Sequence, residues 1–224
     1  MFITVEGLDA SGKSTFMSKL KEWLENKGEK VKIIGKKTIT YDTDDYVGRC
    51  LIHLNHVLFE IIPGDDMTRI PDDAWVKMNA SWFSIVSNNF FDEHSIFLSD
   101  SWIYKRVARF SVLDEYTEEQ MEEMFGTAKK ADITFFLDVP PDVTYGRRER
   151  HSRKDYGFLI TDYNLCTQER FLDFQGKIYQ NLCNLSEKKG WIRLDGRKTT
   201  EEIMEDAILA LSQKLSDGFG GVII

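Results

Sequence analysis

Apolar residues recur at two different spacings along the chain, and each spacing predicts a different kind of element. Short, nearly continuous apolar runs predict buried strands over residues 2–5, 30–35, 95–98, 133–139 and 191–194. Between these runs the apolar residues lie three or four positions apart, which predicts helices over 13–26, 44–62, 72–91, 118–130, 140–150, 165–189 and 200–215. Strands that alternate with helices in this way predict an α/β fold, in which a five-stranded parallel sheet has helices on both faces.

Neither a repeat nor a long linker divides the sequence, so residues 1–224 are predicted to form a single domain. Thr117, followed three residues later by Gln120, has the pattern of a capping box at the start of one helix. The glycine-containing tail at 216–224 is the one segment to which no element is assigned.

A glycine-rich segment directly follows the first predicted strand. Residues 7–14 read G-L-D-A-S-G-K-S, and a predicted helix begins at the end of this segment. In such a strand–loop–helix arrangement, backbone N–H groups and the helix N-terminus bind phosphate. Lys13 is expected to reach the β- and γ-phosphates, and the Ser14 hydroxyl is expected to ligate Mg²⁺. The residues expected to hold the nucleotide are Gly7, Asp9, Ala10, Ser11, Gly12, Lys13, Ser14 and Thr15. The sequence therefore predicts a P-loop NTPase-type three-layer α/β/α fold that binds ATP and Mg²⁺.

Two aspartates are candidates for roles beside this loop. Asp100 comes just after the strand at 95–98, and the carboxyl ends of parallel strands carry the ligand sites of such sheets. Its carboxylate is expected to hold Mg²⁺ opposite Ser14, the alternative being a turn or helix-cap residue. Asp9, inside the loop, is expected either to face a substrate sugar or to cap the loop.

A dense basic segment at residues 147–154 predicts a lid over the polyphosphate. The lid is expected to span residues 146–162. Its positive charges would neutralise the transferred phosphoryl group, although basic residues are also favoured at a solvated helix C-terminus. The candidates for catalysis in this segment are Arg147, Arg148, Arg150 and Arg153.

Other cations and aromatic residues are candidates for binding an acceptor molecule. Surface ion pairing is the alternative for each cation, and packing in the core is the alternative for the aromatic residues. The candidates are Lys36, Arg49, Arg106 and Arg109 for an acceptor phosphate, and Trp82 and Phe83 for stacking on a base.

The composition limits which binding partners and which cellular compartment are expected for this protein. A formal charge of −8 argues against a protein that coats nucleic acid, but it allows a local basic site for a small anion. The three cysteines have neither paired nor metal-ligand spacing, which favours reduced thiols in a cytoplasmic protein. No apolar run reaches membrane-spanning length, and the phosphate loop follows the first strand so early that no cleaved signal peptide is expected.

The chain resembles the thymidylate kinase family of P-loop nucleoside monophosphate kinases. The resemblance rests on residues 2–15, on the strand and helix entry at 137–143, on the basic residues at 147–153 and on the closing segment at 191–202. It implies ATP-dependent phosphorylation of a (deoxy)nucleoside 5′-monophosphate by a homodimer. It also implies that Arg49 faces the acceptor phosphate.

The acceptor site departs from the family pattern. Where the family has an Asp-Arg pair, this chain has Asp100 and Ser101, and Ala108-Arg109-Phe110 stands for an Ala-Tyr-Gln stretch. These differences favour a non-thymidine or modified nucleotide as acceptor, with Lys36, Lys37, Arg106 or Arg109 supplying the missing charge.

Two other functions fit parts of the same pattern. A deoxynucleoside kinase would phosphorylate a hydroxyl group and would need a carboxylate base, for which Asp100 is the plain candidate. A P-loop switch protein would hydrolyse nucleotide without an acceptor, but the sequence contains no Asn/Thr-Lys-x-Asp guanine signature.

Overall fold

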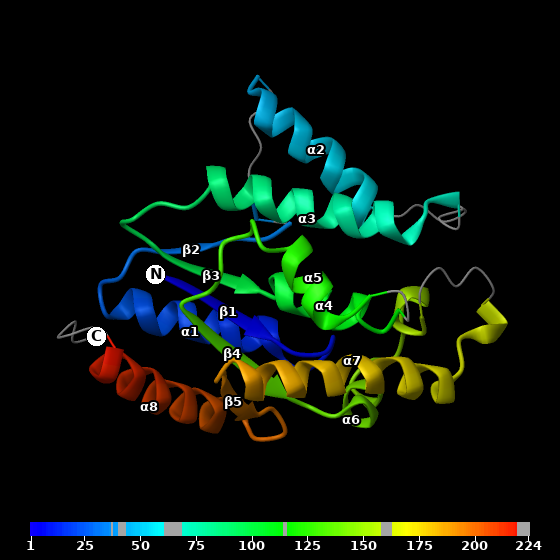
Figure 1. Ribbon diagram of the computed structural model, residues 1–224. Coiled ribbons are helices and arrows are strands. Elements are labelled where there is room, and N and C mark those ends of the chain that lie inside the picture. Colours follow the sequence, from blue (N-terminus) through cyan, green and yellow to red (C-terminus); the bar gives the residue numbers. More distant parts are fainter. Residues whose placement is uncertain (37, 40–43, 61–68, 114–115, 158–162, 219–224) are drawn as a thin grey trace.

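Five parallel strands form the centre of the molecule. The computed structural model describes residues 1–36, 38–39, 44–60, 69–113, 116–157 and 163–218. The sheet has the order β2-β3-β1-β4-β5 (Figure 1). Its strands are β1 (Phe2–Glu6), β2 (Val31–Ile33), β3 (Ile96–Asp100), β4 (Ile133–Asp138) and β5 (Ile192–Asp195). All four strand pairings are parallel, so the predicted fold class is confirmed.

The two faces of the sheet are covered by different helices. On one face, Ile3 and Val5 of β1 pack with side chains of α1 (Lys13–Asn26) and α8 (Thr200–Gly218). On the other face, Phe2 packs with side chains of α3 (Asp72–Asn89), α4 (Ile103–Phe110), α5 (Glu118–Met124) and α7 (Gln168–Lys188). Alternate residues of a strand point to opposite faces, so a continuous apolar run supplies both layers.

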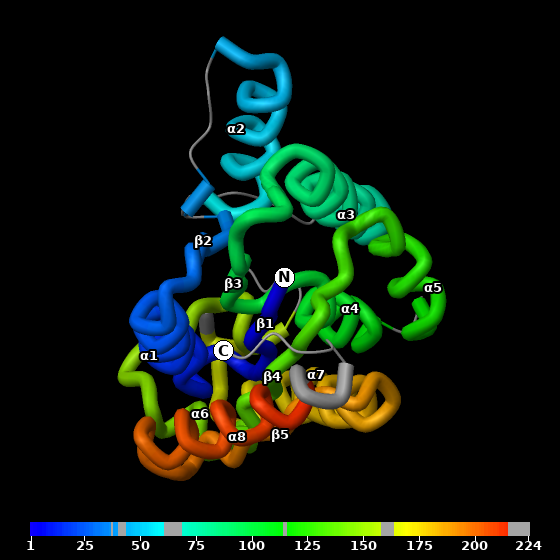
Figure 2. The backbone as a smooth tube through the Cα atoms, turned by 90° about the vertical axis from the view of Figure 1, so that its left-hand side faces the viewer, coloured from blue at the N-terminus to red at the C-terminus, as the bar shows by residue number. Residues whose placement is uncertain are grey.

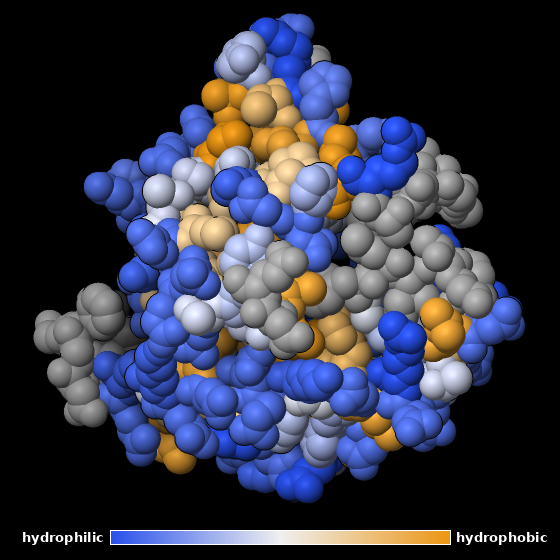
Figure 3. Space-filling model, turned by 45° about the vertical axis from the view of Figure 1, so that its right-hand side comes forward, coloured by the Kyte–Doolittle hydropathy of each residue, from blue (hydrophilic) through white to orange (hydrophobic). Residues whose placement is uncertain are grey.

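Helix α2 (Tyr46–Phe59) lies at the outer edge of the molecule and packs against α3 rather than the sheet (Figure 2). Apolar side chains gather on the surface over this helix, where they form the orange area near the top of Figure 3. Two large side chains of α2, Tyr46 and Val57, have exposed fractions of 76% and 45%.

Several helix boundaries differ from the prediction because caps and turns decide them. The helix expected from 165 begins instead at Gln168, since the Thr167 hydroxyl accepts the Arg170 N–H at 3.2 Å. The helix expected over 140–150 is α6 (Pro141–Gly146), which ends before the basic segment. Thr117 and Gln120 form the predicted capping box. The sequence analysis assigned no element to α4.

No helix among the described residues is both long and apolar enough to cross a bilayer. Lys37, the end of the predicted lid (158–162) and most of the predicted tail (219–224) lie outside the described residues.

Candidate active site

The glycine-rich loop joins β1 to α1 with a backbone that few side chains would allow. Gly7, Ala10 and Gly12 have positive φ values of 146°, 65° and 98°. A Cβ at Gly7 would lie 2.9 Å from both the Leu137 carbonyl oxygen and the Ser11 hydroxyl. Gly12 is the N-cap of α1, and the first turn of that helix contains no acidic residue. The N-terminal N–H groups of α1 are thus suited to an anion.

Lys13, Ser14 and Asp100 meet at the mouth of this loop. The Lys13 ammonium donates to the Leu8 carbonyl oxygen at 2.6 Å and lies 4.0 Å from one carboxylate oxygen of Asp100. The Ser14 hydroxyl donates to the other at 2.7 Å. Burial lowers the pKa of Lys13 to about 8, and the nearby ammonium of Lys105 adds to this effect. A bound polyphosphate would favour the charged form of Lys13.

Two of these side chains, those of Ser14 and Asp100, have oxygen atoms that could bind a magnesium ion. Mg²⁺ in nucleotide sites takes one or two oxygen ligands from the protein and completes its shell with water and phosphate oxygens. The Ser14 hydroxyl and the Asp100 carboxylate lie next to each other at the edge of the loop, where they could supply two such ligands.

Glu6, at the end of β1, is a site residue that the sequence analysis missed. It is fully buried, and its Oε1 atom accepts the Trp102 N–H at 2.8 Å. Its Oε2 atom has no hydrogen-bond partner among the described residues. Burial raises the pKa of Glu6 to about 7, against the opposing effects of that N–H group, Lys105 and Lys13. An acidic residue that ends an otherwise apolar strand was the available signal.

Replacing Glu6 with glutamine is expected to flatten the dependence of stability on pH. The carboxyl pKa is 4.5 without the fold and about 7 within it, so the folded protein holds the extra proton between these values. The free energy of unfolding of the parent therefore falls as the pH rises through this window. Glutamine keeps an oxygen for the Trp102 N–H but has no charge to bury. Since one pKa unit corresponds to about 1.4 kcal/mol, the variant should gain on the order of 3 kcal/mol at pH 8 and less than about 1 kcal/mol at pH 5.

Urea unfolding at pH 5 and pH 8 measures this difference. Glu22→Gln, at an exposed position on α1, is the matched control and should follow the parent. If the free energy of unfolding changes equally with pH in the parent and in Glu6→Gln, the raised pKa of Glu6 is contradicted.

Asp9 connects the loop to α4. Its carboxylate pairs with the Lys105 ammonium at 2.6 Å. The charge of Lys105, with smaller effects from Lys13 and Arg148, holds the pKa of Asp9 well below its usual range. The partner of Asp9 in the structure is thus a lysine on a neighbouring helix, which neither sequence-based interpretation included.

Helix α4 carries three cations, of which Lys105 and Arg106 precede Arg109 by four and three residues, so that each neighbours Arg109 on the helix surface. The Arg106 guanidinium lies 5.6 Å from the ring centre of Phe59, and the Lys36 ammonium lies 4.8 Å from the same ring. The structure therefore brings together two of the predicted acceptor-site cations. Burial lowers the pKa of Arg106 and lowers that of Arg109 to about 10, the latter with a contribution from Arg106.

The predicted lid arginines have different positions. Arg147 donates to the carbonyl oxygens of Ser11 at 3.3 Å and Gly196 at 2.8 Å, so it contacts the phosphate loop directly. Arg148 lies close enough to influence Asp9. Arg150 is exposed, and Arg153 begins a 3₁₀ turn, η2 (Arg153–Asp155).

The two aromatic candidates are core residues, which corrects the prediction that they stack on a base. Trp82 and Phe83 are 1% and 4% exposed. Their rings form edge contacts with each other, and Trp82 also contacts Phe59 while Phe83 contacts Trp102. Neither ring leaves a face for a nucleotide base, because both faces are packed in the core.

Arg49 is held on its own helix. Its guanidinium donates to the Asp44 carbonyl oxygen at 2.9 Å and lies 5.8 Å from the ring centre of Tyr46. Its assignment to the acceptor phosphate stays a prediction.

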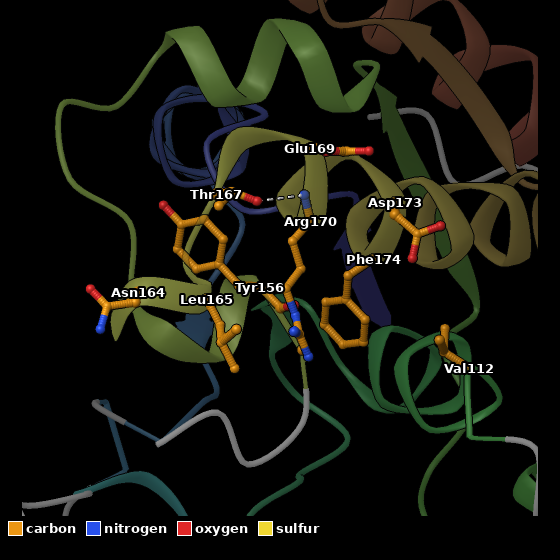
Figure 4. A pocket seen from close by; sticks show the side chains of 10 residues that line it. Val112, Tyr156, Asn164, Leu165, Thr167, Glu169, Arg170, Asp173 and Phe174 are labelled. Carbon is orange, nitrogen blue, oxygen red and sulfur yellow. Dashed lines mark hydrogen bonds between the residues drawn. The ribbon is translucent and has the colours of Figure 1, made fainter. Parts of the chain in front are cut away.

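A cavity of about 600 Å³ lies at the start of α7, next to Tyr156 and Gly157 of the predicted lid. Tyr156, Arg170 and Phe174 line it, and Leu165 of the turn η3 (Tyr163–Leu165) closes one side (Figure 4). No local sequence pattern indicates this cavity, since the residues that line it come from three separate segments.

Comparison with known proteins identifies several that are similar to this chain. No model of a known protein family matches it. It is 25% identical over 223 residues to a probable thymidylate kinase of Methanosphaera stadtmanae, covering 93% of this chain and 95% of that protein. It is also 25% identical to a thymidylate kinase of Plasmodium falciparum, covering 92% and 87%, and to one of Kosmotoga olearia, covering 97% and 100%. These relatives support the assignment to the thymidylate kinase family.

The similarity thus extends over nearly the whole chain and not only over the phosphate loop. The relatives are named thymidylate kinases, and the similarity to them indicates a nucleotide kinase, which is a phosphotransferase. The loop residues predict ATP and Mg²⁺ as its cofactors.

Proposed function

We propose that this chain transfers the γ-phosphoryl group of ATP to a (deoxy)nucleoside 5′-monophosphate, and that the acceptor is a non-thymidine or modified nucleotide. The observation that carries the proposal is the meeting of Lys13, Ser14 and Asp100 beside the basic face of α4. A site for a polyphosphate thus adjoins a second group of cations that suits another phosphate.

To catalyse this transfer, the protein has to position the two substrates and stabilise negative charge on the phosphates. The attacking oxygen of a monophosphate is already anionic, so the reaction needs no general base. Lys13 and the N-terminus of α1 would hold the triphosphate, and Arg147 and Arg148 lie where they can act on charge at the loop. Ser14 and Asp100 would hold a Mg²⁺ ion, which would supply positive charge to the polyphosphate.

The acceptor side supports a substrate that differs from thymidylate. Ser101 stands where the family pattern has an arginine, and α4 carries Arg106 and Arg109 farther along the helix. Arg106 has no ion-pair partner among the described residues, and its pKa is lowered by burial. We place the acceptor phosphate against Arg106, because an anion there would compensate a charge that burial now disfavours.

A panel of acceptors tests this function. Formation of ADP from ATP and Mg²⁺ should depend on a nucleoside monophosphate, with a monophosphate other than thymidylate giving the highest kcat/KM. Phosphorylation of thymidine but not of monophosphates would favour a nucleoside kinase with Asp100 as base. Hydrolysis of ATP that no acceptor accelerates would favour a switch protein.

We further propose that the chain forms a homodimer and that it acts in the cytoplasm. The apolar surface over α2, with Tyr46 and Val57 exposed, supports a second copy as its partner. Sedimentation should then give about twice the chain mass of 26.0 kDa, and a single-chain mass at micromolar concentration would contradict the dimer.

A further inference from the structure

The last residues of the basic segment form a turn that is fixed from several sides. Within the turn, the Ser152 N–H donates to the Asp155 carboxylate at 2.8 Å, and Asp155 is 2% exposed. From α7, Gln175 donates to the Asp155 carbonyl oxygen at 2.7 Å, and Arg170 donates to that of Tyr156 at 3.3 Å. Figure 4 shows Arg170 and Phe174 of α7 beside Tyr156. The turn is therefore seated on α7.

Arg109 adds a contact of a different kind, since it comes from α4. Its Nη2 atom donates to the carbonyl oxygen of Lys154 at 2.5 Å, within the turn η2. Its guanidinium also lies 5.0 Å from the ring centre of Phe174 in α7. This side chain of α4 thus contacts two other elements, η2 and α7.

The other end of the basic segment is fixed at the phosphate loop. Arg147 donates to the backbone of the loop and to Gly196. The segment therefore lies between two attached ends. Arg147 binds the phosphate loop at one end, and at the other end the turn is bound by α7 and by Arg109 of α4. Arg148, Arg150 and Arg153 lie between them, so their positions depend on both.

We propose that Arg109 is a positioning residue, which holds the basic segment over the phosphate loop through the Lys154 carbonyl oxygen. The proposal rests on the proposed function, in which the arginines of that segment act on the transferred phosphoryl group. Because a misplaced charge loses most of its effect on the transition state, release of the turn should lower kcat. A direct contact with the acceptor phosphate would chiefly raise KM for the acceptor.

Arg109→Met and Arg109→Lys separate these roles. Methionine keeps an apolar stem on Phe174 but removes the donor, and we expect kcat to fall about 10-fold or more with the acceptor KM changed less than about 3-fold. Lysine keeps a donor that can reach the carbonyl oxygen, and it should restore most of kcat. Arg197→Met, at an exposed position after β5, is the matched control and should behave as the parent.

Limited trypsin digestion without nucleotides gives a second measurement that needs no activity. The bonds after Arg150, Arg153 and Lys154 should be cut faster in Arg109→Met than in the parent, with Arg109→Lys close to the parent. Thermal unfolding identifies a variant that fails to fold. The digestion therefore tests the attachment even if the acceptor panel contradicts the proposed function. An unchanged cutting rate in folded Arg109→Met, or a raised KM with unchanged kcat, would overturn the proposal.

Discussion

Replacing Lys13 with alanine is expected to lower kcat about 1,000-fold or more while the protein still folds. The Lys13 ammonium lies at the mouth of the phosphate loop, 4.0 Å from Asp100, where it would meet the phosphates of ATP. Single cations at phosphoryl-transfer sites contribute on the order of 1,000-fold or more to the rate. The fold should lose little, because the Lys13 ammonium donates to the Leu8 carbonyl oxygen and lies at the limit of ion-pair distance from Asp100, while its burial disfavours its charge.

A coupled assay of ADP formation measures this loss, and calorimetry with Mg²⁺ and ATP measures the accompanying loss of affinity. Lys19→Ala changes an exposed lysine on the same helix and should retain the activity of the parent. Parental turnover in a folded Lys13→Ala variant would refute the phosphate-binding role of the loop.

Replacing Asp100 with asparagine is expected to lower kcat about 100-fold at moderate Mg²⁺ concentration. Asparagine keeps an oxygen that can accept the Ser14 hydroxyl, which donates to Asp100 at 2.7 Å, but it lacks the negative charge. The ion would then be held by fewer charged ligands, and its contribution of several kcal/mol to the transition state would be partly lost. More Mg²⁺ should therefore be needed for half-maximal activity.

Titration of activity with Mg²⁺ tests this role. Asp173→Asn, an exposed aspartate on α7 that pairs with Lys177, serves as the control. If Asp100→Asn needs no more Mg²⁺ than the parent, Asp100 does not hold the ion.

The sheet and the phosphate loop could be predicted because their signals are local. Each strand is a short apolar run, and the loop combines its glycines, Lys13 and Ser14 within eight residues. Helix α4 was missed for a physical reason. It is eight residues long and follows Ser101, which has a φ of 62°, and its first N–H group at Trp102 bonds to Glu6 far away in the sequence.

The contacts around the acceptor side depend on the tertiary fold. Asp9 meets Lys105, and Glu6 meets Trp102, across 96 residues, because β3 lies beside β1 in the sheet. No spacing within either segment indicates these partners. The prediction for Trp82 failed because an aromatic residue at helical spacing fits the core as well as a binding site, and only packing decides between them.

The links between β1, its loop and α4 indicate where substrate preference can be changed by directed evolution. Trp102 bonds to Glu6 and Lys105 bonds to Asp9. These contacts hold the first turn of α4 against β1 and the phosphate loop. Libraries that vary this turn would damage donor handling together with acceptor choice. Such libraries should instead vary Arg106 and the neighbouring Lys36, because substitutions there leave these contacts intact.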